Sequence, residues 1–152
     1  MKLVLATFNH GKLREFRERF GVLPVELISL SDVEGTHGPV ETGATLEDNA
    51  RLKARAALGL TGLPAIADDT GLEIDALSGR PGVRSARYAG PGATDAANRA
   101  VVLQQMAGIP EGSRLARFRT VIAVCFPDGP DVVVEGVLEG RITTTARGTH
   151  GF

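Results

Sequence analysis

Residues 67–90 read ADDTGLEIDALSGRPGVRSARYAG, and two adjacent carboxylates, Asp68 and Asp69, follow the apolar run 63–67 at its start. Adjacent like charges repel, and burial of either one without a partner is costly. A solvated polar turn would make the pair tolerable, and so would a bound cation. We expect short strands over residues 64–67 and 72–77, with the two aspartates at the end of the first.

Apolar spacing on either side of this stretch predicts alternating strands and helices. Leu13, Phe16 and Phe20 recur at helical spacing, in a helix that ends near Gly21. Thr45 and Asp48 have the spacing of a helix-capping pair. The helix that they begin buries an apolar face and ends at Gly59; that face consists of Leu46, Ala50, Ala54 and Ala57.

The remaining segments complete an α/β pattern. Residues 79–92 hold four glycines and two prolines, which predicts a long loop, and Thr94 caps a third helix that runs to about Met106. The sequence PDGPD at 127–131 joins two β-rich runs and indicates a hairpin. Strands are expected over residues 2–6, 25–30, 117–126 and 132–142, which favours an α/β sheet with some antiparallel pairing.

Composition narrows the functional classes. The chain has 152 residues, 43% of them apolar, which suits one domain with a real core. The net charge of −1 gives no reason to expect nucleic acid or a membrane surface as a partner. The single cysteine, Cys125, excludes a disulfide framework, and no run approaches membrane-spanning length. A reducing cytoplasm fits these features.

The stretch TFNHGK at residues 7–12 lies between a predicted strand and a predicted helix. Backbone N–H groups at a helix N-terminus attract anions, and Lys12 adds positive charge. Asn9 could bind a phosphate or fix the turn. The alternative is an ordinary strand–helix turn with a solvated lysine.

A second set of polar residues precedes and follows the start of the predicted helix at Thr45. Asn49 and Lys53 are four residues apart and share one helix face, and Glu41 lies in the preceding loop. These side chains could reach a cleft beside the sheet, or they could form a solvated helix face.

The paired aspartates suit a magnesium ion, which takes one or two carboxylates together with phosphate oxygens and water. Asp68 and Asp69 would point to opposite sides of an extended backbone and would then have different roles. The alternative is a polar turn. Further along, Arg87 could clamp a phosphate or lock its own loop.

Five motifs in order carry a resemblance to a known family: T-x-N-x-G-K at 7–12, E-T-G at 41–43, N-A-x-x-K-A at 49–54, A-D-D-T-G-L at 67–72 and P-G-x-x-S-A-R-Y at 81–88. Their order and spacing resemble those of the inosine/xanthosine triphosphate pyrophosphatases, the RdgB-like or Ham1-like family. The terminal G-x-x-G-F at 148–152 is similar to the start of that family's G-F-G-Y-D-P motif.

The resemblance implies an α/β, two-lobed ITPase-like fold of the Ham1/Maf type, with an elongated mixed β-sheet, flanking helices and a central substrate cleft. It implies a single ITPase-like domain over residues 1–152. The implied activity is magnesium-dependent hydrolysis of ITP, dITP and XTP between the α and β phosphates, which cleanses the nucleotide pool. A cytoplasmic homodimer that binds neither nucleic acid nor membrane is also implied.

The matching motifs carry the family's roles to individual residues. Glu41 and Asp69 are expected to hold Mg²⁺, and Asp69 is expected to accept a proton from the attacking water. Lys53 is expected to support the phosphate site, and Thr70 takes the place of a residue that is more often serine in the family. Residues expected to bind the triphosphate or the base are Thr7, Phe8, Asn9, His10, Gly11, Lys12, Lys53, Thr70 and Phe152.

Two departures from the family pattern leave alternatives open. Phe8 is bulky for a phosphate loop, although its ring could point into the core. The family continues beyond the position of Phe152 through G-Y-D-P, a lysine, S-H-R and a final helix, so we expect that the C-terminal part of the family domain is missing. The alternatives are a Maf-type pyrophosphatase, a catalytically impaired nucleotide-binding fragment, and a phosphate-binding α/β domain without purine preference.

Overall fold

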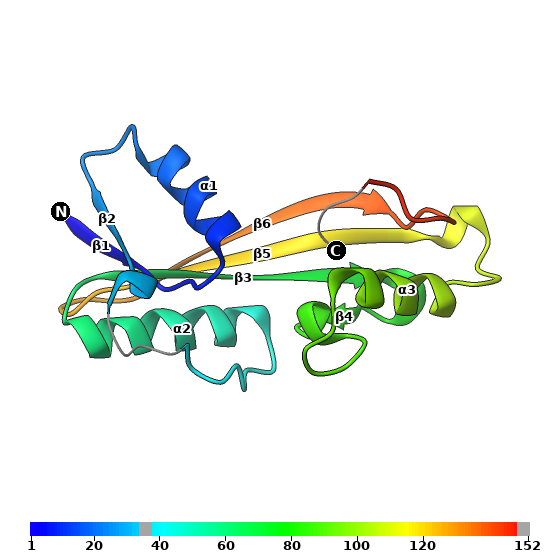
Figure 1. Cartoon of the computed structure of the whole chain (residues 1–152), viewed down its shortest axis with the longest axis horizontal. Helices are drawn as coiled ribbons and strands as arrows, with labels where there is room; N and C mark the ends of the chain where they lie inside the picture. The colour runs from blue at the N-terminus through cyan, green and yellow to red at the C-terminus, as the bar shows by residue number, and fades with distance from the viewer. Residues whose placement is uncertain (34–37, 149–152) are drawn as a thin grey trace. The chain divides into compact units, whose positions relative to one another are not determined.

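The computed structural model describes residues 1–33 and 38–148, and it describes His10 only through its place in a helix. It contains a six-stranded sheet of order β2-β1-β3-β5-β6, in which β4 pairs with β3 (Figure 1). The strands are β1 (Lys2–Leu5), β2 (Glu26–Ser29), β3 (Ala65–Ile74), β4 (Arg80–Gly82), β5 (Leu115–Cys125) and β6 (Val132–Arg141); the α-helices are α1 (His10–Phe20), α2 (Leu46–Thr61) and α3 (Asp95–Gln105).

The sheet is mixed, which confirms the predicted fold class. Strand β1 is parallel to β2 and to β3, whereas β3 is antiparallel to β4. The register of β1 and β2 pairs Lys2 with Glu26 and Leu5 with Ser29. None of the helices in residues 1–33 and 38–148 is long and apolar enough to cross a membrane.

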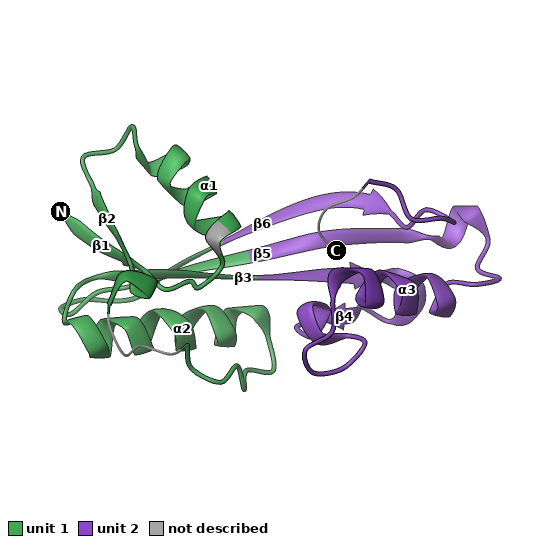
Figure 2. Cartoon of the chain, viewed as in Figure 1, with its two compact units in different colours: residues 1–69, 121–134 green, residues 70–120, 135–152 purple. Residues whose placement is uncertain are grey.

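The chain forms two compact units, which Figure 2 distinguishes by colour. Unit 1 comprises residues 1–69 and 121–134, and unit 2 comprises residues 70–120 and 135–152. Strands β3, β5 and β6 each contribute residues to both units. Each unit has a hydrophobic core of its own, and each is described separately below.

The core of unit 1 forms between α1 and the strands. Leu13 of α1 packs with Leu3, Leu5 and Ile66 of β1 and β3, and all four are buried. Phe16 and Phe20 extend the same helix face and stack with ring centroids 5.7 Å apart. Within unit 1, Figure 1 shows α1 and α2 on opposite sides of the strands.

Helix α2 confirms its predicted start and corrects its predicted end. The Thr45 hydroxyl accepts from the Asp48 N–H, and the Asp48 carboxylate accepts from the Thr45 N–H, so the capping box is complete. The predicted end at Gly59 is wrong, because the helix continues to Thr61 and Gly62 follows with φ 67°. An interior glycine costs a helix only about 1 kcal/mol, whereas a left-handed C-cap favours glycine strongly.

Strand β3 is one continuous strand, so the prediction of two short strands over residues 64–67 and 72–77 is wrong. Asp68 and Asp69 lie in the middle of this strand, and as whole residues they are 6% and 8% exposed. The polar turn offered as an alternative is therefore wrong too. The backbone stays extended because each carboxylate has a cationic partner, as described in the next subsection.

The core of unit 2 packs α3 against the sheet. Val102 of α3 and Met106, the C-cap of α3, form a buried cluster with Leu72 and Ile74 of β3 and Ala116 of β5. Thr94 caps α3 through its hydroxyl, which accepts from the Ala97 N–H, as the sequence predicts.

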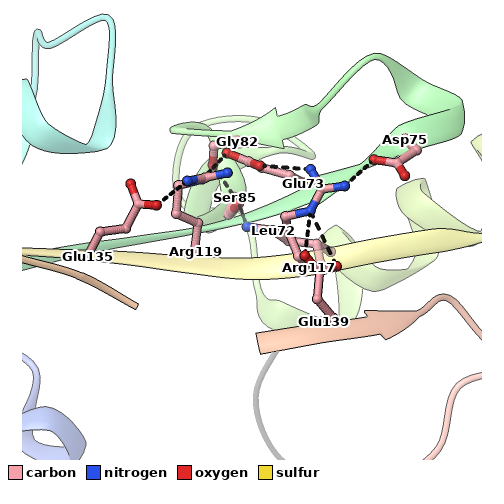
Figure 3. A network of polar contacts seen from close by, with 9 residues as sticks. All are labelled: Leu72, Glu73, Asp75, Gly82, Ser85, Arg117, Arg119, Glu135 and Glu139. Atoms are coloured by element: carbon pink, nitrogen blue, oxygen red, sulfur yellow. Dashed lines mark hydrogen bonds and ion pairs between the residues drawn. The ribbon is translucent and has the colours of Figure 1, made fainter. Parts of the chain in front are cut away.

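The predicted loop at 79–92 contains the strand β4 and a 3₁₀ turn over Ser85–Arg87, so it is partly regular structure. Ser85 is buried; its hydroxyl donates to the Gly82 carbonyl at 2.6 Å and accepts from the Leu72 N–H at 2.8 Å (Figure 3). Asn98 of α3 adds two hydrogen bonds to the loop, from the Ala89 N–H and to the Ala86 carbonyl. Ser85 and Asn98 therefore lock this segment.

A ladder of ion pairs crosses the strands of unit 2 (Figure 3). Arg119 of β5 donates to Glu73 of β3 at 3.0 Å and also pairs with Glu135 of β6. Arg117 pairs with Asp75 at 2.6 Å and with Glu139 at 3.3 Å. Opposite charges on neighbouring strands favour the observed alignment of β3, β5 and β6. Because these pairs are partly exposed, each contributes little to the stability of the fold.

Arg114 joins three parts of unit 2 through carbonyl groups. It is 4% exposed, and its guanidinium donates to the carbonyls of Met106, Ile109, Ile142 and Thr143. Met106 is the C-cap of α3, where the helix dipole favours a positive charge. This side chain therefore fixes residues 142–143 beside the end of α3.

We expect Arg114→Met to lower the free energy of unfolding by about 3 kcal/mol or more, because buried carbonyls left without donors cost about 1–3 kcal/mol each. Urea unfolding followed by circular dichroism measures the change. Arg84→Met, at an exposed arginine of the same unit, serves as the control. Equal effects of the two substitutions would contradict the role assigned to Arg114.

In unit 1, Asp131 connects the segment between β5 and β6 to α2. Its carboxylate accepts from Arg51 at 2.9 Å and from Arg55 at 2.7 Å. The hydrogen bond from Arg55 holds the pKa of Asp131 below its ordinary value of 3.8, with further contributions from Cys125 and Arg51. Cys125 is fully buried, and burial raises the pKa of its thiol.

Because the folded state lowers the pKa of Asp131, this group stabilises the fold above pH 3.8, and the contribution is lost as the pH falls through the lower folded pKa. Asp131→Asn should therefore lower the melting temperature at pH 7, and its difference from the original chain should shrink below pH 3.8. Thermal unfolding between pH 2.5 and pH 7 tests this; a difference independent of pH would count against it.

Candidate functional site

Asp69 is the centre of a polar cluster between β3 and α2 in unit 1. Its Oδ2 accepts a hydrogen bond from Asn49 Nδ2 at 3.1 Å, and its Oδ1 accepts one from Lys53 Nζ at 3.0 Å. The side chain of Asp69 is 12% exposed. Asn49 and Lys53 reach it together because they lie one turn apart on α2, as their spacing predicts.

Lys53 joins Asp69 to a second carboxylate. Its ammonium lies 3.1 Å from Glu41 Oε1, and the lysine side chain is 15% exposed. Burial lowers the pKa of Lys53, but the charges of Asp69 and Glu41 outweigh that effect and raise the pKa above its ordinary 10.5. Two carboxylates therefore converge on one cation.

Asn49 is fully buried and uses both ends of its side-chain amide. Its Oδ1 accepts from the Gly43 N–H at 2.8 Å while its Nδ2 donates to Asp69. A Cβ at position 43 would lie 2.5 Å from Asn49 Oδ1, so only glycine fits beside this amide. The spacing of Asn49 and Lys53 predicts their shared helix face, but it predicts no role for Asn49 or for Gly43.

Asp68 pairs with a different element. Its carboxylate forms an ion pair with Lys12 of α1, and the Asp68 side chain is 6% exposed. Successive side chains of a strand point to opposite faces, so Asp68 meets α1 whereas Asp69 meets α2. The adjacent aspartates are tolerated because each has a lysine on its own side of the sheet.

The segment from Thr7 to Lys12 connects β1 to α1, as predicted. Asn9 is the N-cap of α1; its Oδ1 accepts from the Gly11 N–H at 2.9 Å and from the Lys12 N–H at 3.2 Å. The Thr7 hydroxyl accepts from the Asn9 N–H. Asn9 therefore fixes the turn, which is one of the two roles left open for it.

The other predicted residues lie outside the Asp69 cluster or outside the described chain. Phe8 is 43% exposed, so the alternative that its ring points into the core is wrong. The Thr70 hydroxyl lies 2.9 Å from the Thr120 hydroxyl in unit 2. Phe152 lies outside the described residues, and so does the side chain of His10.

Glu41 and Asp69 are the groups of this cluster that suit a metal ion. Among the described residues, no group of three or more His, Cys, Asp or Glu side chains has metal-binding geometry. Magnesium is held by one or two protein carboxylates, and substrate phosphates and water complete its six oxygen ligands. Glu41 and Asp69 both contact the Lys53 ammonium, so they lie close enough together to fit that requirement.

Comparison with known proteins gives consistent matches across the chain. A sequence model of the Ham1 family matches residues 3–152. The dITP/XTP pyrophosphatase of Geobacter sulfurreducens is 48% identical over 151 residues, which cover 99% of this chain and 76% of that protein.

Solved structures agree in fold. A HAM1 protein from Coxiella burnetii has a TM-score of 0.91 and 41% identity, covering 100% of this chain and 78% of that one. A structure titled nucleoside-triphosphatase / dITP/XTP pyrophosphatase, from Mycobacterium abscessus, has a TM-score of 0.86 and 45% identity, with 100% and 80% covered.

Removal of the shared lysine tests the electrostatics of the cluster. We expect Lys53→Met to lower the free energy of unfolding by about 3 kcal/mol in EDTA, because it leaves two carboxylates without their cation. Urea unfolding measures the loss, and Lys2→Met, at an exposed lysine of β1, is the control. No difference between these variants would mean that the ion pairs contribute nothing to stability.

Proposed function

This chain belongs to the Ham1 family, and we propose that it hydrolyses the purine nucleoside triphosphates ITP, dITP and XTP to a monophosphate and pyrophosphate. Such an enzyme is a hydrolase acting on acid anhydrides. Water adds across the anhydride bond between the α and β phosphates, and the proton of the water passes to a base. By removing these nucleotides, the enzyme would cleanse the nucleotide pool.

The arrangement around Asp69 is the observation that supports this proposal most directly. Asp69 is a nearly buried carboxylate fixed by Asn49 and Lys53, with Glu41 on the same ammonium. We propose that Asp69 is the catalytic base and that it accepts the proton of the attacking water. A base must be held within hydrogen-bonding reach of that water, and the hydrogen bond from the buried Asn49 amide holds this carboxylate in place.

Glu41 and Asp69 are proposed to hold Mg²⁺. When bound, Mg²⁺ neutralises phosphate charge and lowers the pKa of coordinated water. Hydrolysis of a phosphoanhydride depends mainly on positioning and charge neutralisation, so the protein needs no covalent nucleophile. The choice of carboxylate ligands rather than histidine or cysteine agrees with a hard cation.

Positive charge for the triphosphate is proposed to come from Lys53 and Lys12. Lys53 is protonated at neutral pH, as an ordinary lysine is, and the charges of Asp69 and Glu41 raise its pKa further. Its ammonium can therefore transfer hydrogen bonds from the carboxylates to a phosphate. Lys12 is held by Asp68 at the start of α1, in the segment from Thr7 proposed as the phosphate loop. Two further roles are proposed from the motifs alone: Thr70 contacts a phosphate, and Phe152 contacts the purine ring of the substrate.

Three further proposals rest on the family. The sequence model that matches residues 3–152 supports one ITPase-like domain made of both units. A homodimer and a cytoplasmic location are proposed from the family resemblance. Light scattering on the purified chain would show whether two copies associate.

Pyrophosphate release from ITP, XTP, dITP, ATP and GTP, with Mg²⁺ and with EDTA, tests the activity. We expect metal-dependent release that favours ITP, XTP and dITP. Asp69→Asn should lower kcat by at least about 100-fold, since a positioned base contributes roughly 10²–10⁴-fold. Asp128→Asn, at an exposed aspartate between β5 and β6, should retain the original rate.

Equal rates of pyrophosphate release for Asp69→Asn and the original chain would mean that Asp69 is not the catalytic base. Release from ATP and GTP as fast as from ITP would favour a phosphate-binding domain without purine preference. An unchanged melting temperature with ITP and Mg²⁺, together with no release from any triphosphate, would overturn the proposal.

A further inference from the structure

We propose that Asn49 is a positioning residue that fixes both proposed metal-binding carboxylates through one buried amide. One end of the amide holds Asp69 directly, and the other end holds the backbone of Gly43, two residues from Glu41. The inference rests on the proposed function, because it concerns the cation site of that reaction. Asn49 touches neither substrate nor cation in this role.

The hydrogen bonds fix which way the amide points. The Gly43 N–H is a donor, so the atom that faces it at 2.8 Å must be the carbonyl oxygen of Asn49. The NH₂ end then faces Asp69 Oδ2, where it donates at 3.1 Å. A reversed amide would place two donors together at one end and two acceptors together at the other. Because Asn49 is fully buried, water cannot compensate for that loss.

Gly43 allows this contact by having no side chain. A Cβ there would lie 2.5 Å from Asn49 Oδ1 and 2.7 Å from Asp48 Cβ, inside normal contact distance. The requirement for glycine at position 43 is therefore close approach, not backbone conformation. The same contact holds the segment that carries Glu41 against the start of α2.

Lys53 cannot set this geometry when a divalent cation occupies the site. Its ammonium is shared between Glu41 and Asp69, and a cation bound by those carboxylates would repel it. Asn49 is neutral, so its contact with Asp69 does not weaken in that way. Groups that hold metal ligands in place typically change metal affinity or activity 10–100-fold when removed.

The chain offers a matched control in Asn98 of unit 2. Asn98 is also fully buried, accepts from a backbone N–H (Ala89, 2.8 Å) and donates through Nδ2 (Ala86 carbonyl, 3.1 Å). Both of these partners are backbone groups, so Asn98 ties a loop to a helix and its two hydrogen bonds hold no carboxylate. Asn49→Ala and Asn98→Ala therefore remove the same side chain from equally buried positions.

The experiment measures the affinity of the whole chain for Mn²⁺ alone, from the electron paramagnetic resonance signal of free Mn²⁺. Circular dichroism and thermal unfolding establish that each variant is folded at the working temperature. Gly43→Ala is the second variant, because it keeps the amide but displaces it. Pyrophosphate release from ITP with Mg²⁺ is measured on the same samples.

We expect the Kd for Mn²⁺ to rise about tenfold or more in Asn49→Ala and Gly43→Ala, with kcat falling and the KM for ITP nearly constant. Asn98→Ala should lower the melting temperature and leave the Kd for Mn²⁺ unchanged. A folded Asn49→Ala variant with the affinity of the original chain would overturn the inference and leave the proposed function intact. An original chain that neither binds Mn²⁺ nor releases pyrophosphate would overturn the proposed function, and the inference with it.

Discussion

The extended backbone of β3 at two consecutive aspartates is the constraint on which unit 1 depends. A strand sends adjacent side chains to opposite faces, so one element cannot neutralise both carboxylates. Lys12 of α1 pairs with Asp68, whereas Lys53 and Asn49 of α2 hold Asp69. Charges removed from water need such partners, and a lost partner costs several kcal/mol. The docking of both helices is therefore coupled to the same two residues.

The surroundings of the two aspartates differ, and the difference bears on chemistry. Asp69 has a neutral amide on one oxygen and a lysine on the other, and that lysine leads to Glu41. The ion pair of Asp68 lies at the start of α1, beside the turn fixed by Asn9. A second carboxylate, that of Glu41, contacts the same lysine ammonium as Asp69. The metal and base roles proposed for Asp69 rest on this arrangement.

Local signals in the sequence predicted most of the fold. These signals depend on residues within a few positions of one another, so they can be recognised directly in the sequence. They are the helical spacing of Leu13, Phe16 and Phe20 and the caps at Thr45 and Thr94.

Strand β3 was mispredicted because the partners of its two aspartates are distant in the sequence. Lys12 is 56 positions from Asp68, and Asn49 is 20 positions from Asp69. Without those partners, two aspartates in a row resemble a turn. The order of the motifs predicted that Glu41, Lys53 and Asp69 form one site. Two other features exist only in the folded chain, namely the close approach of Gly43 to Asn49 and the carbonyl groups around Arg114.

Cys125 gives the chain a built-in reporter of local opening. It is the single thiol of the sequence, it is fully buried in β5, and burial raises its pKa. A maleimide or aromatic disulfide reagent reacts with the thiolate and needs direct access to sulfur. Labelling of the native chain therefore requires unit 1 to open locally around β5. The labelling rate then measures how often this opening occurs, and no cysteine needs to be introduced. Ligands that hold α2 against β3 would slow that chemistry in proportion to the opening that they suppress.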